Sequence, residues 1–108
     1  MSAVDYVIVL TTWPVDQDAA RLARTLVDER LAACVNVLPE MRSTYRWKGQ
    51  VEEARERQLV LKTSRARVPA LEARLRELHP YDLPEFLVIP VAAGGAEYLA
   101  WIAAGTSP

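Results

Sequence analysis

The stretch LAACVNVLPEMRSTYRWKGQVEEARERQLVLKT, residues 31–63, decides the fold of this chain. Past Pro39 its side chains alternate between two faces, as they do in a β-strand. A tight polar turn is predicted at Trp47-Lys48-Gly49-Gln50, because glycine favours turns and the residues around it are polar. The stretch therefore predicts two long strands joined as a hairpin.

The predicted hairpin is too long for its own domain. Its first arm, Ala32 to Tyr45, extends roughly 45 Å at about 3.3 Å per residue, whereas a helix of the size expected elsewhere in the chain spans about 20 Å. An uncovered pair of strands that carries Tyr45 and Trp47 is an aggregation hazard unless a specific partner covers it. The simplest partner is a second copy of the chain, so we expect an oligomer.

The second arm carries a conflicting signal. Residues 52–58 are better helix formers than strand formers, so local propensity alone favours a helix. A strand is favoured by the position after Gly49, by the β-rich ending at residues 59–63, and by the chance for Glu52 to Glu56 to pair across the turn with Arg42 and Arg46.

Composition restricts the function classes. A chain of 108 residues, 51% hydrophobic and 25% charged, predicts one ordinary globular domain, residues 1–108. A net charge of −1 gives no electrostatic reason to expect nucleic acid or an anionic membrane as partner. Met1 to Asp5 lacks the regions of a signal peptide, and a single cysteine forms no internal disulfide, so the expected compartment is the cytoplasm.

Other elements flank the hairpin. A buried strand is predicted at residues 6–12, ended by Trp13-Pro14, and a second buried strand at 86–89. Helices are predicted from an Asp16 or Asp18 cap to about Leu31, from Pro69 to Leu78 or His79, and over residues 96–104, followed by a frayed tail. The order βαββαβ plus a short C-terminal helix predicts an α+β, ferredoxin-like two-layer sandwich with a long hairpin between its second and third strands.

Two side chains are of metal-ligand type, Cys34 and His79. Neither lies in a CxxC or HxxxH arrangement, so their spacing alone does not define a site. A lone cysteine such as Cys34 is most often a small buried apolar residue, and a histidine placed like His79 is most often a residue at a helix C-terminus, so the residues alone give metal binding only weak support. The chain has no phosphate-binding glycine loop and no nucleophile elbow, so we expect no enzyme.

Four ordered stretches together resemble the CutA family of divalent-cation tolerance proteins: residues 31–36 (LAACVN), 43–49 (STYRWKG), 79–85 (HPYDLPE) and 98–101 (YLAW). The resemblance implies a ferredoxin-like subunit similar to the PII signalling proteins. It also implies a tight homotrimer held through the long hairpins, and a role in tolerance of copper and other divalent metals.

The resemblance also assigns residues. Cys34 and His79 fall on the positions associated with metal contact, and Tyr45 and Trp47 on the hairpin aromatics of the trimer interface. Thr11 stands where some bacterial members carry another cysteine, and a hydroxyl is a poor soft-metal ligand. We therefore expect a weakly bound, exchangeable copper or other divalent ion, shared between neighbouring chains, and no obligatory cofactor.

Two function classes follow. The first is a metal-responsive binding protein of the copper-tolerance kind. The second is a PII-like signalling or scaffold trimer that binds a small anionic ligand or a partner protein, with only an indirect link to metals.

Overall fold

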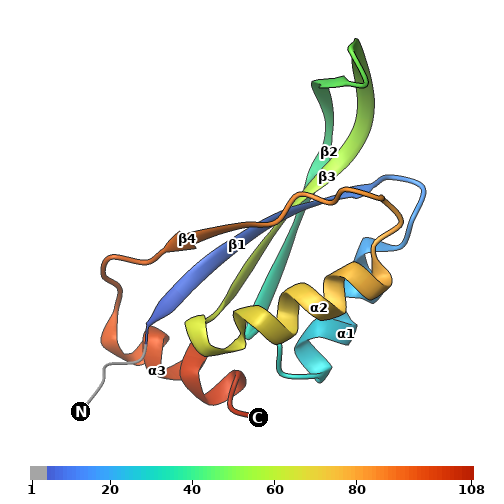
Figure 1. The fold of residues 1–108 in the computed structure, drawn as a ribbon. Coiled ribbons are helices and arrows are strands. Elements are labelled where there is room, and N and C mark those ends of the chain that lie inside the picture. Colours follow the sequence, from blue (N-terminus) through green and yellow to red (C-terminus); the bar gives the residue numbers. More distant parts are fainter. Residues whose placement is uncertain (1–4) are drawn as a thin grey trace.

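The computed structural model describes residues 5–108, and the expectation about a signal peptide falls on residues 1–4, outside this range. Four strands and three helices follow one another along the chain (Figure 1). They are β1 (Tyr6–Pro14), α1 (Ala19–Asp28), β2 (Cys34–Trp47), β3 (Gln50–Ser64), a 3-10 turn (Arg65–Arg67), α2 (Val68–Leu78), β4 (Leu87–Pro90) and α3 (Ala96–Gly105).

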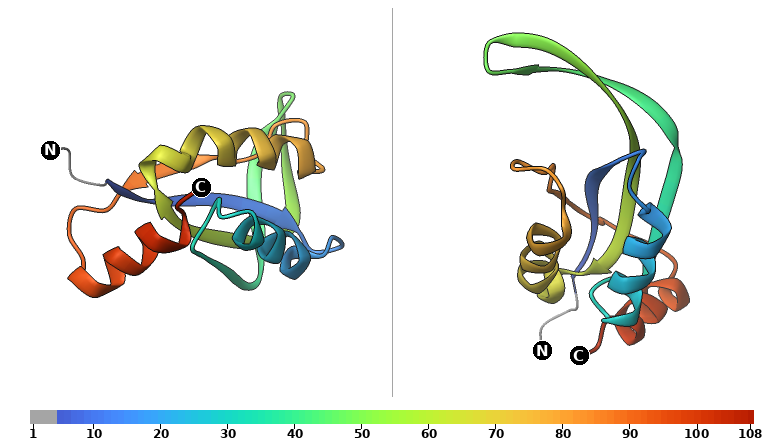
Figure 2. Two further views of the ribbon diagram at one scale, coloured as in Figure 1. Left: turned by 90° about the horizontal axis from the view of Figure 1, so that it is seen from below. Right: turned by 90° about the vertical axis from the view of Figure 1, so that its right-hand side faces the viewer.

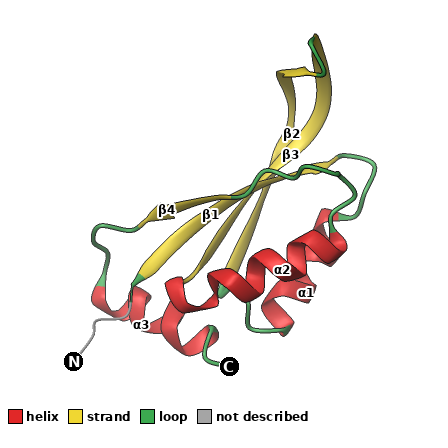
Figure 3. Ribbon diagram, viewed as in Figure 1, coloured by secondary structure: helices red, strands yellow, loops and turns green. Residues whose placement is uncertain are grey.

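The strands form one sheet in the order β2-β3-β1-β4, and every neighbouring pair is antiparallel. Helices α1 and α2 lie side by side on one face of this sheet, and α3 packs at its end (Figures 1 and 3). This arrangement confirms the predicted ferredoxin-like sandwich. None of the helices within residues 5–108 is long and apolar enough to cross a membrane.

The hairpin is also confirmed, including its uncertain second arm. Lys48 and Gly49 both have positive φ, 50° and 80°, as a two-residue hairpin turn requires, and Trp47 pairs with Gln50 across it. Strand β3 pairs with β2 along its length and with β1 over Glu56–Ser64, so tertiary pairing overrides its helical propensity. The hairpin curves out of the body of the subunit (Figure 2). With the hairpin included, the subunit measures 49 × 26 × 24 Å.

A β-bulge interrupts the first arm. Val37 pairs with Leu59 and Glu40 with Arg57, so β2 uses one residue more than β3 over this interval. Pro39 lies inside the bulge, where its missing N–H costs no ladder hydrogen bond. Because the bulge shifts the alternation by one residue, the odd-numbered residues from 41 to 47 lie on the same face as Cys34.

Helix α1 ends earlier than predicted. Asp18 caps it as expected, accepting a hydrogen bond from the Arg21 amide at 3.0 Å. The expected end near Leu31 is wrong, because Arg30 has a left-handed φ of 60° and the helix stops at Asp28. The amide of Leu31 then donates to the carbonyl of Leu26, a Schellman closure that turns the chain into β2.

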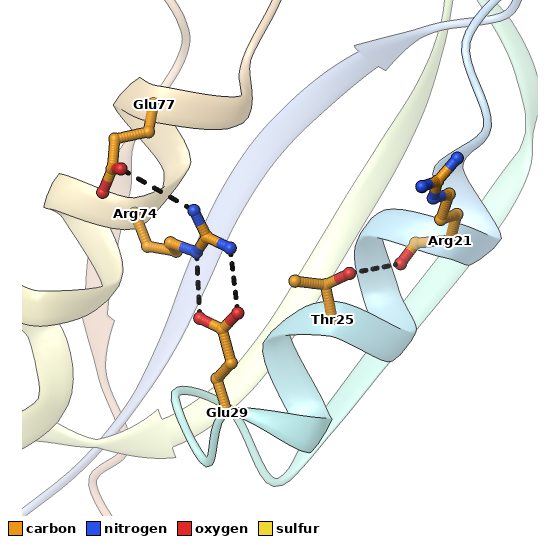
Figure 4. A network of polar contacts seen from close by, with 5 residues as sticks. All are labelled: Arg21, Thr25, Glu29, Arg74 and Glu77. Carbon is orange, nitrogen blue, oxygen red and sulfur yellow. Dashed lines mark hydrogen bonds and ion pairs between the residues drawn. The ribbon is translucent and has the colours of Figure 1, made fainter.

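The core lies between the sheet and the two long helices. Its sheet side is formed by odd-numbered residues of β1 and β3 and its helix side by leucines of α1 and α2, all at most 5% exposed: Val7, Val9, Leu59, Leu61, Leu22, Leu26, Leu71 and Leu75. At the rim Arg74 of α2 forms a two-pronged ion pair with Glu29, with both N–O distances 2.9 Å (Figure 4). The hydrogen bond from Arg74 lowers the pKa of Glu29.

Two expectations near the C-terminus are wrong. The last strand is not buried, since Leu87 and Ile89 are 54% and 44% exposed. They point away from α1 and α2, because they pair with Leu10 and Ile8 on the face that those helices leave uncovered. The tail is not frayed at Thr106, which is 2% exposed and donates a hydrogen bond to Ile102.

Two buried polar atoms of β1, Thr11 Oγ1 and Trp13 Nε1, have no hydrogen-bond partner among the described residues. Thr11 is fully buried, as is Thr63, whose hydroxyl donates to the Leu31 carbonyl at 2.8 Å. The two threonines therefore differ in whether burial of the hydroxyl is compensated.

We expect Thr11→Val to raise the free energy of unfolding by about 1 kcal/mol, because it removes an uncompensated hydroxyl and keeps the shape of the side chain. The matched variant Thr63→Val should lower it by about 1 kcal/mol or more, since it leaves the Leu31 carbonyl without its donor. Chemical denaturation of the three proteins measures both changes. A loss of stability in Thr11→Val would show that the hydroxyl has a partner.

Candidate functional site

A cleft of about 820 Å³ opens where the hairpin, the end of β1 and the loop between α2 and β4 meet. This volume is within the range of small-molecule sites. The hairpin provides one wall through both of its strands, and the loop from Pro80 to Glu85 provides the other. The lining residues are Thr12, Met41, Ser43, Thr44, Tyr45, Arg46, Trp47, Glu52, Glu56, Gln58 and Pro80 to Glu85.

Side chains hold the α2–β4 loop in place. Strand β4 pairs with β1 only as far as Leu10, and beyond it the carbonyls of Thr11 and Thr12 accept side-chain hydrogen bonds instead. Gln58 donates to the Thr11 carbonyl at 2.8 Å and to the Glu85 carboxylate at 2.9 Å. The Gln58 bonds fix the Glu85 end of the loop, and the bond between His79 and the Thr12 carbonyl fixes its other end. Together they determine the shape of the cleft.

His79 is one of these anchors. Its Nε2 lies 2.7 Å from the Thr12 carbonyl, which can only accept, and its Nδ1 lies 3.1 Å from the Tyr81 amide, which can only donate. The ring is therefore the neutral Nε2–H tautomer. Burial lowers the pKa of His79 and outweighs the opposing effects of the Thr12 carbonyl and the Glu56 carboxylate.

This geometry bears on metal binding by His79. A neutral imidazole has one free lone pair, and here the Tyr81 amide occupies it. The ring is also 8% exposed and lies between Trp13 and Tyr81, with centroid distances of 4.6 and 4.8 Å. A metal ion at His79 would have to displace the Tyr81 amide.

Cys34 lies elsewhere. It begins β2, is half-buried, and pairs with Lys62, whereas Thr12, the partner of His79, pairs with Gln58. Four residues along β3 separate these positions by about 13 Å. One subunit therefore does not bring Cys34 and His79 together, and a site shared between subunits stays a prediction. Within residues 5–108 no three His, Cys, Asp or Glu side chains are grouped to hold a metal ion.

Tyr45 and Trp47 both line the cleft, and neither packs into the core of its own subunit. They are 41% and 36% exposed, and Lys48 Nζ lies 5.9 Å from the centre of the Trp47 ring. Two large aromatic side chains at the end of a protruding hairpin are compatible with a partner surface, and their role at a trimer interface stays a prediction.

Glu56 has a role that the sequence analysis missed. The cross-strand pairing expected of Glu52 to Glu56 with Arg42 and Arg46 is wrong in detail, because only Arg42 and Glu53 approach, at 4.0 Å. Glu56 instead accepts a hydrogen bond from the Tyr81 hydroxyl at 2.8 Å. Strand alternation was the available signal, since Glu56 pairs with Met41, on the face opposite to Arg42.

The state of His79 predicts a pH dependence of stability. Because its pKa is lower in the folded chain than its usual value near 6.5, the unfolded chain binds the proton first as pH falls. Stability should be complete above about pH 6.5 and should be lost as pH falls toward the folded pKa. The midpoint of thermal unfolding should drop between pH 7.5 and 5.5 more in the parent than in His79→Gln. This is the only histidine, so equal drops would contradict the prediction.

Comparison with known proteins shows that the chain is similar to one protein family. The family described as CutA1 divalent ion tolerance protein matches residues 7–105. The chain is 46% identical over 99 residues to the divalent-cation tolerance protein CutA of Thermus thermophilus, covering 92% of this chain and 96% of that one. It is 46% identical over 98 residues to its namesake in Pectobacterium atrosepticum, covering 91% and 89%.

The fold agrees with solved relatives. The crystal structure of CutA1 from Oryza sativa superposes with a TM-score of 0.92 at 36% identity, covering 96% of this chain and 95% of that one. The structure of the divalent cation tolerance protein from Thermus thermophilus superposes with a TM-score of 0.91 at 44% identity, covering 94% and 99%. The family match spans nearly all of the described residues, so this chain belongs to the CutA1 divalent ion tolerance family.

Proposed function

We propose that this chain is a homotrimeric, metal-responsive binding protein that contributes to copper and other divalent-metal tolerance, and that it is not an enzyme. The family membership supports the link to divalent cations. The observation that carries assembly is the uncovered face of the sheet, which is apolar where a free subunit would meet water.

The uncovered face supports an obligate oligomer. Leu87 and Ile89 of β4 and Tyr98 and Trp101 of α3 are each 44–54% exposed, although all are large and apolar. The outer edges of β2 and β4 are also unpaired within the described subunit, so strands of neighbouring chains can extend the sheet. Burial of this face and of the hairpin would remove more than about 2,000 Å² from water, as in obligate interfaces.

Assembly should therefore control stability. Light scattering should give a trimer at micromolar concentration, with an unfolding temperature that rises with protein concentration. Trp47→Ala should weaken assembly by about 3 kcal/mol or more if its ring is buried between chains. Val27→Ala is the matched control, because Val27 has similar exposure, 40%, but lies on α1 in the helix layer. A stable monomeric parent would refute the trimer.

Cys34 is the principal candidate ligand. A thiolate favours Cu(I) or Zn over Mg or Ca, and Cys34 lies half-buried on the uncovered face, where a neighbouring chain could complete its coordination. His79 would contribute only after losing the Tyr81 amide, so its part should be weaker than that of the thiol. Incomplete coordination suits an exchangeable ion in a sensing or buffering site.

Copper titration of the parent, Cys34→Ser and His79→Ala at equal concentration tests this site. We expect affinity to fall at least tenfold in Cys34→Ser, to fall in His79→Ala, and to weaken below about pH 6 as protons compete for the ligands. Thr11→Val is the control and should bind as the parent does. If neither ligand substitution lowers the affinity, the site is refuted and the PII-like class becomes the better proposal.

One observation favours the PII-like class: the cleft is large enough to hold a small molecule. Its charge does not suit the anionic ligand of that class, since Glu52, Glu56, Asp82 and Glu85 line it together with a single cationic residue, Arg46. A small ligand of this cleft would have to be of another chemical kind.

A further inference from the structure

The two faces of the protruding hairpin carry opposite charge. We call the face that lines the cleft the cleft face, and the opposite one the back of the hairpin. Because side chains alternate, the pair Met41 and Glu56 lies on the cleft face and the adjacent pair Arg42 and Arg55 lies on the back. The back carries three arginines and two glutamates: Arg42, Arg55, Arg57, Glu40 and Glu53. The cleft is lined by four carboxylates and one arginine: Glu52, Glu56, Asp82, Glu85 and Arg46.

Neither face is electrostatically balanced within one subunit. Glu56 is 7% exposed, its hydrogen-bond donor is the neutral Tyr81 hydroxyl, and no ion pair found in residues 5–108 includes it. Carboxylates are seldom buried to this extent unless a positive charge accompanies them. On the back, Arg42 and Arg55 lie directly opposite each other, and like charges in this arrangement destabilise a strand pair. The cleft therefore lacks a cation, and the back has cations in excess.

Arg42 is the most available arginine on the back. Its side chain is 74% exposed, and its ion pair with Glu53 is long, at 4.0 Å. Arg55 is bonded to a glutamate on the opposite strand of the hairpin, and Arg57 donates to a backbone carbonyl. Within one subunit Arg42 cannot meet Glu56, because the two side chains lie on opposite faces of the same hairpin. It can reach only the Glu56 carboxylate of another chain.

We propose that the back of each hairpin lies in the cleft of a neighbouring chain, with the Arg42 guanidinium as the cationic partner of the Glu56 carboxylate. This inference rests on the proposed trimer and names the surfaces that form it. The Tyr81 hydroxyl occupies only Oε2 of Glu56, so the carboxylate can still accept hydrogen bonds from a guanidinium. In the assembled protein the cleft is then filled by a second copy of the chain.

This contact joins two different surfaces, head to tail. The hairpin curves out of the subunit, so a neighbour can approach it from both sides (Figure 2). A chain that places its back in the cleft of one neighbour keeps its own cleft free for another chain. Contacts of this kind form closed rings when the rotation between subunits permits, and a ring of three pairs every Arg42 with a Glu56. A twofold dimer built from either surface alone would instead bring like-charged faces together.

A double-mutant cycle read out as subunit exchange tests the pair. Native mass spectrometry of parent trimers mixed with isotope-labelled trimers gives the exchange rate. Arg42→Gln and Glu56→Gln should each speed exchange by at least about tenfold, and the double variant should exchange no faster than the faster single variant, because either substitution already removes the pair. Glu56→Gln keeps an oxygen for the Tyr81 hydroxyl. Arg24→Gln is the matched control and should exchange as the parent does, because Arg24 is an exposed arginine of α1 that pairs with Asp28 at 3.9 Å.

Three outcomes would overturn this proposal. Single variants that exchange at the parent rate would show that Arg42 is not the cation that Glu56 lacks. A double variant whose acceleration equals the product of the two single accelerations would show that the residues act independently. Equal acceleration in Arg24→Gln would reduce the effect to overall charge. A monomeric parent would refute the trimer itself, whereas a trimer without coupling between the two residues would refute only this contact.

Discussion

The pairing of β3 on both of its sides is the constraint on which the subunit depends. Over Glu56–Ser64 this strand is hydrogen-bonded to β1 and β2 at once, and it contributes Leu59 and Leu61 to the core. Beyond β1 the same strand continues as the second arm of the hairpin, paired only with β2. The ladder that builds the core therefore also supports the protruding arm, and displacement of β3 would disrupt both.

Strand β4, in contrast to β3, is too short to pair along the whole of its neighbour β1, and this shortness creates the cleft. A four-residue strand leaves the last part of β1 without a neighbour on that side, and His79 and Gln58 satisfy its carbonyls in place of backbone amides. Side chains can be rearranged more readily than a strand ladder. The loop that they anchor is thus the least constrained wall of the cleft, whereas the hairpin wall is fixed by its backbone pairing.

Features that depend on residues close together in the sequence could be predicted, whereas features that depend on contacts between distant residues could not. The turn at Lys48-Gly49 and the cap of α1 are local: the sequence predicted the turn and narrowed the cap to Asp16 or Asp18, of which the structure uses Asp18. The end of α1 was missed because Arg30, and not a glycine, adopts the left-handed conformation there. That choice is made by the core packing of Leu31, which no local pattern reveals.

The candidate site was harder for the same reason. Cys34 and His79 were recognised by residue type, but their separation depends on strand register, and the bond between Tyr81 and Glu56 joins segments 25 residues apart. The exposed apolar residues of β4 show a further limit. A run of apolar residues marks a surface that avoids water, yet it does not say whether the same chain or another covers it.

The bulge at Pro39 has a consequence for how the hairpin can change in length. Because residues opposite each other in the ladder share a face, removal of one residue from the bulge would leave a regular ladder with Val37 still opposite Leu59 and Tyr45 still opposite Glu52, and no later side chain of β2 would change face. Paired insertions or deletions, one on each arm beside the turn, would leave the alternation below them intact. Evolution can therefore lengthen or shorten this arm at its tip while the residues around Glu56 stay in place.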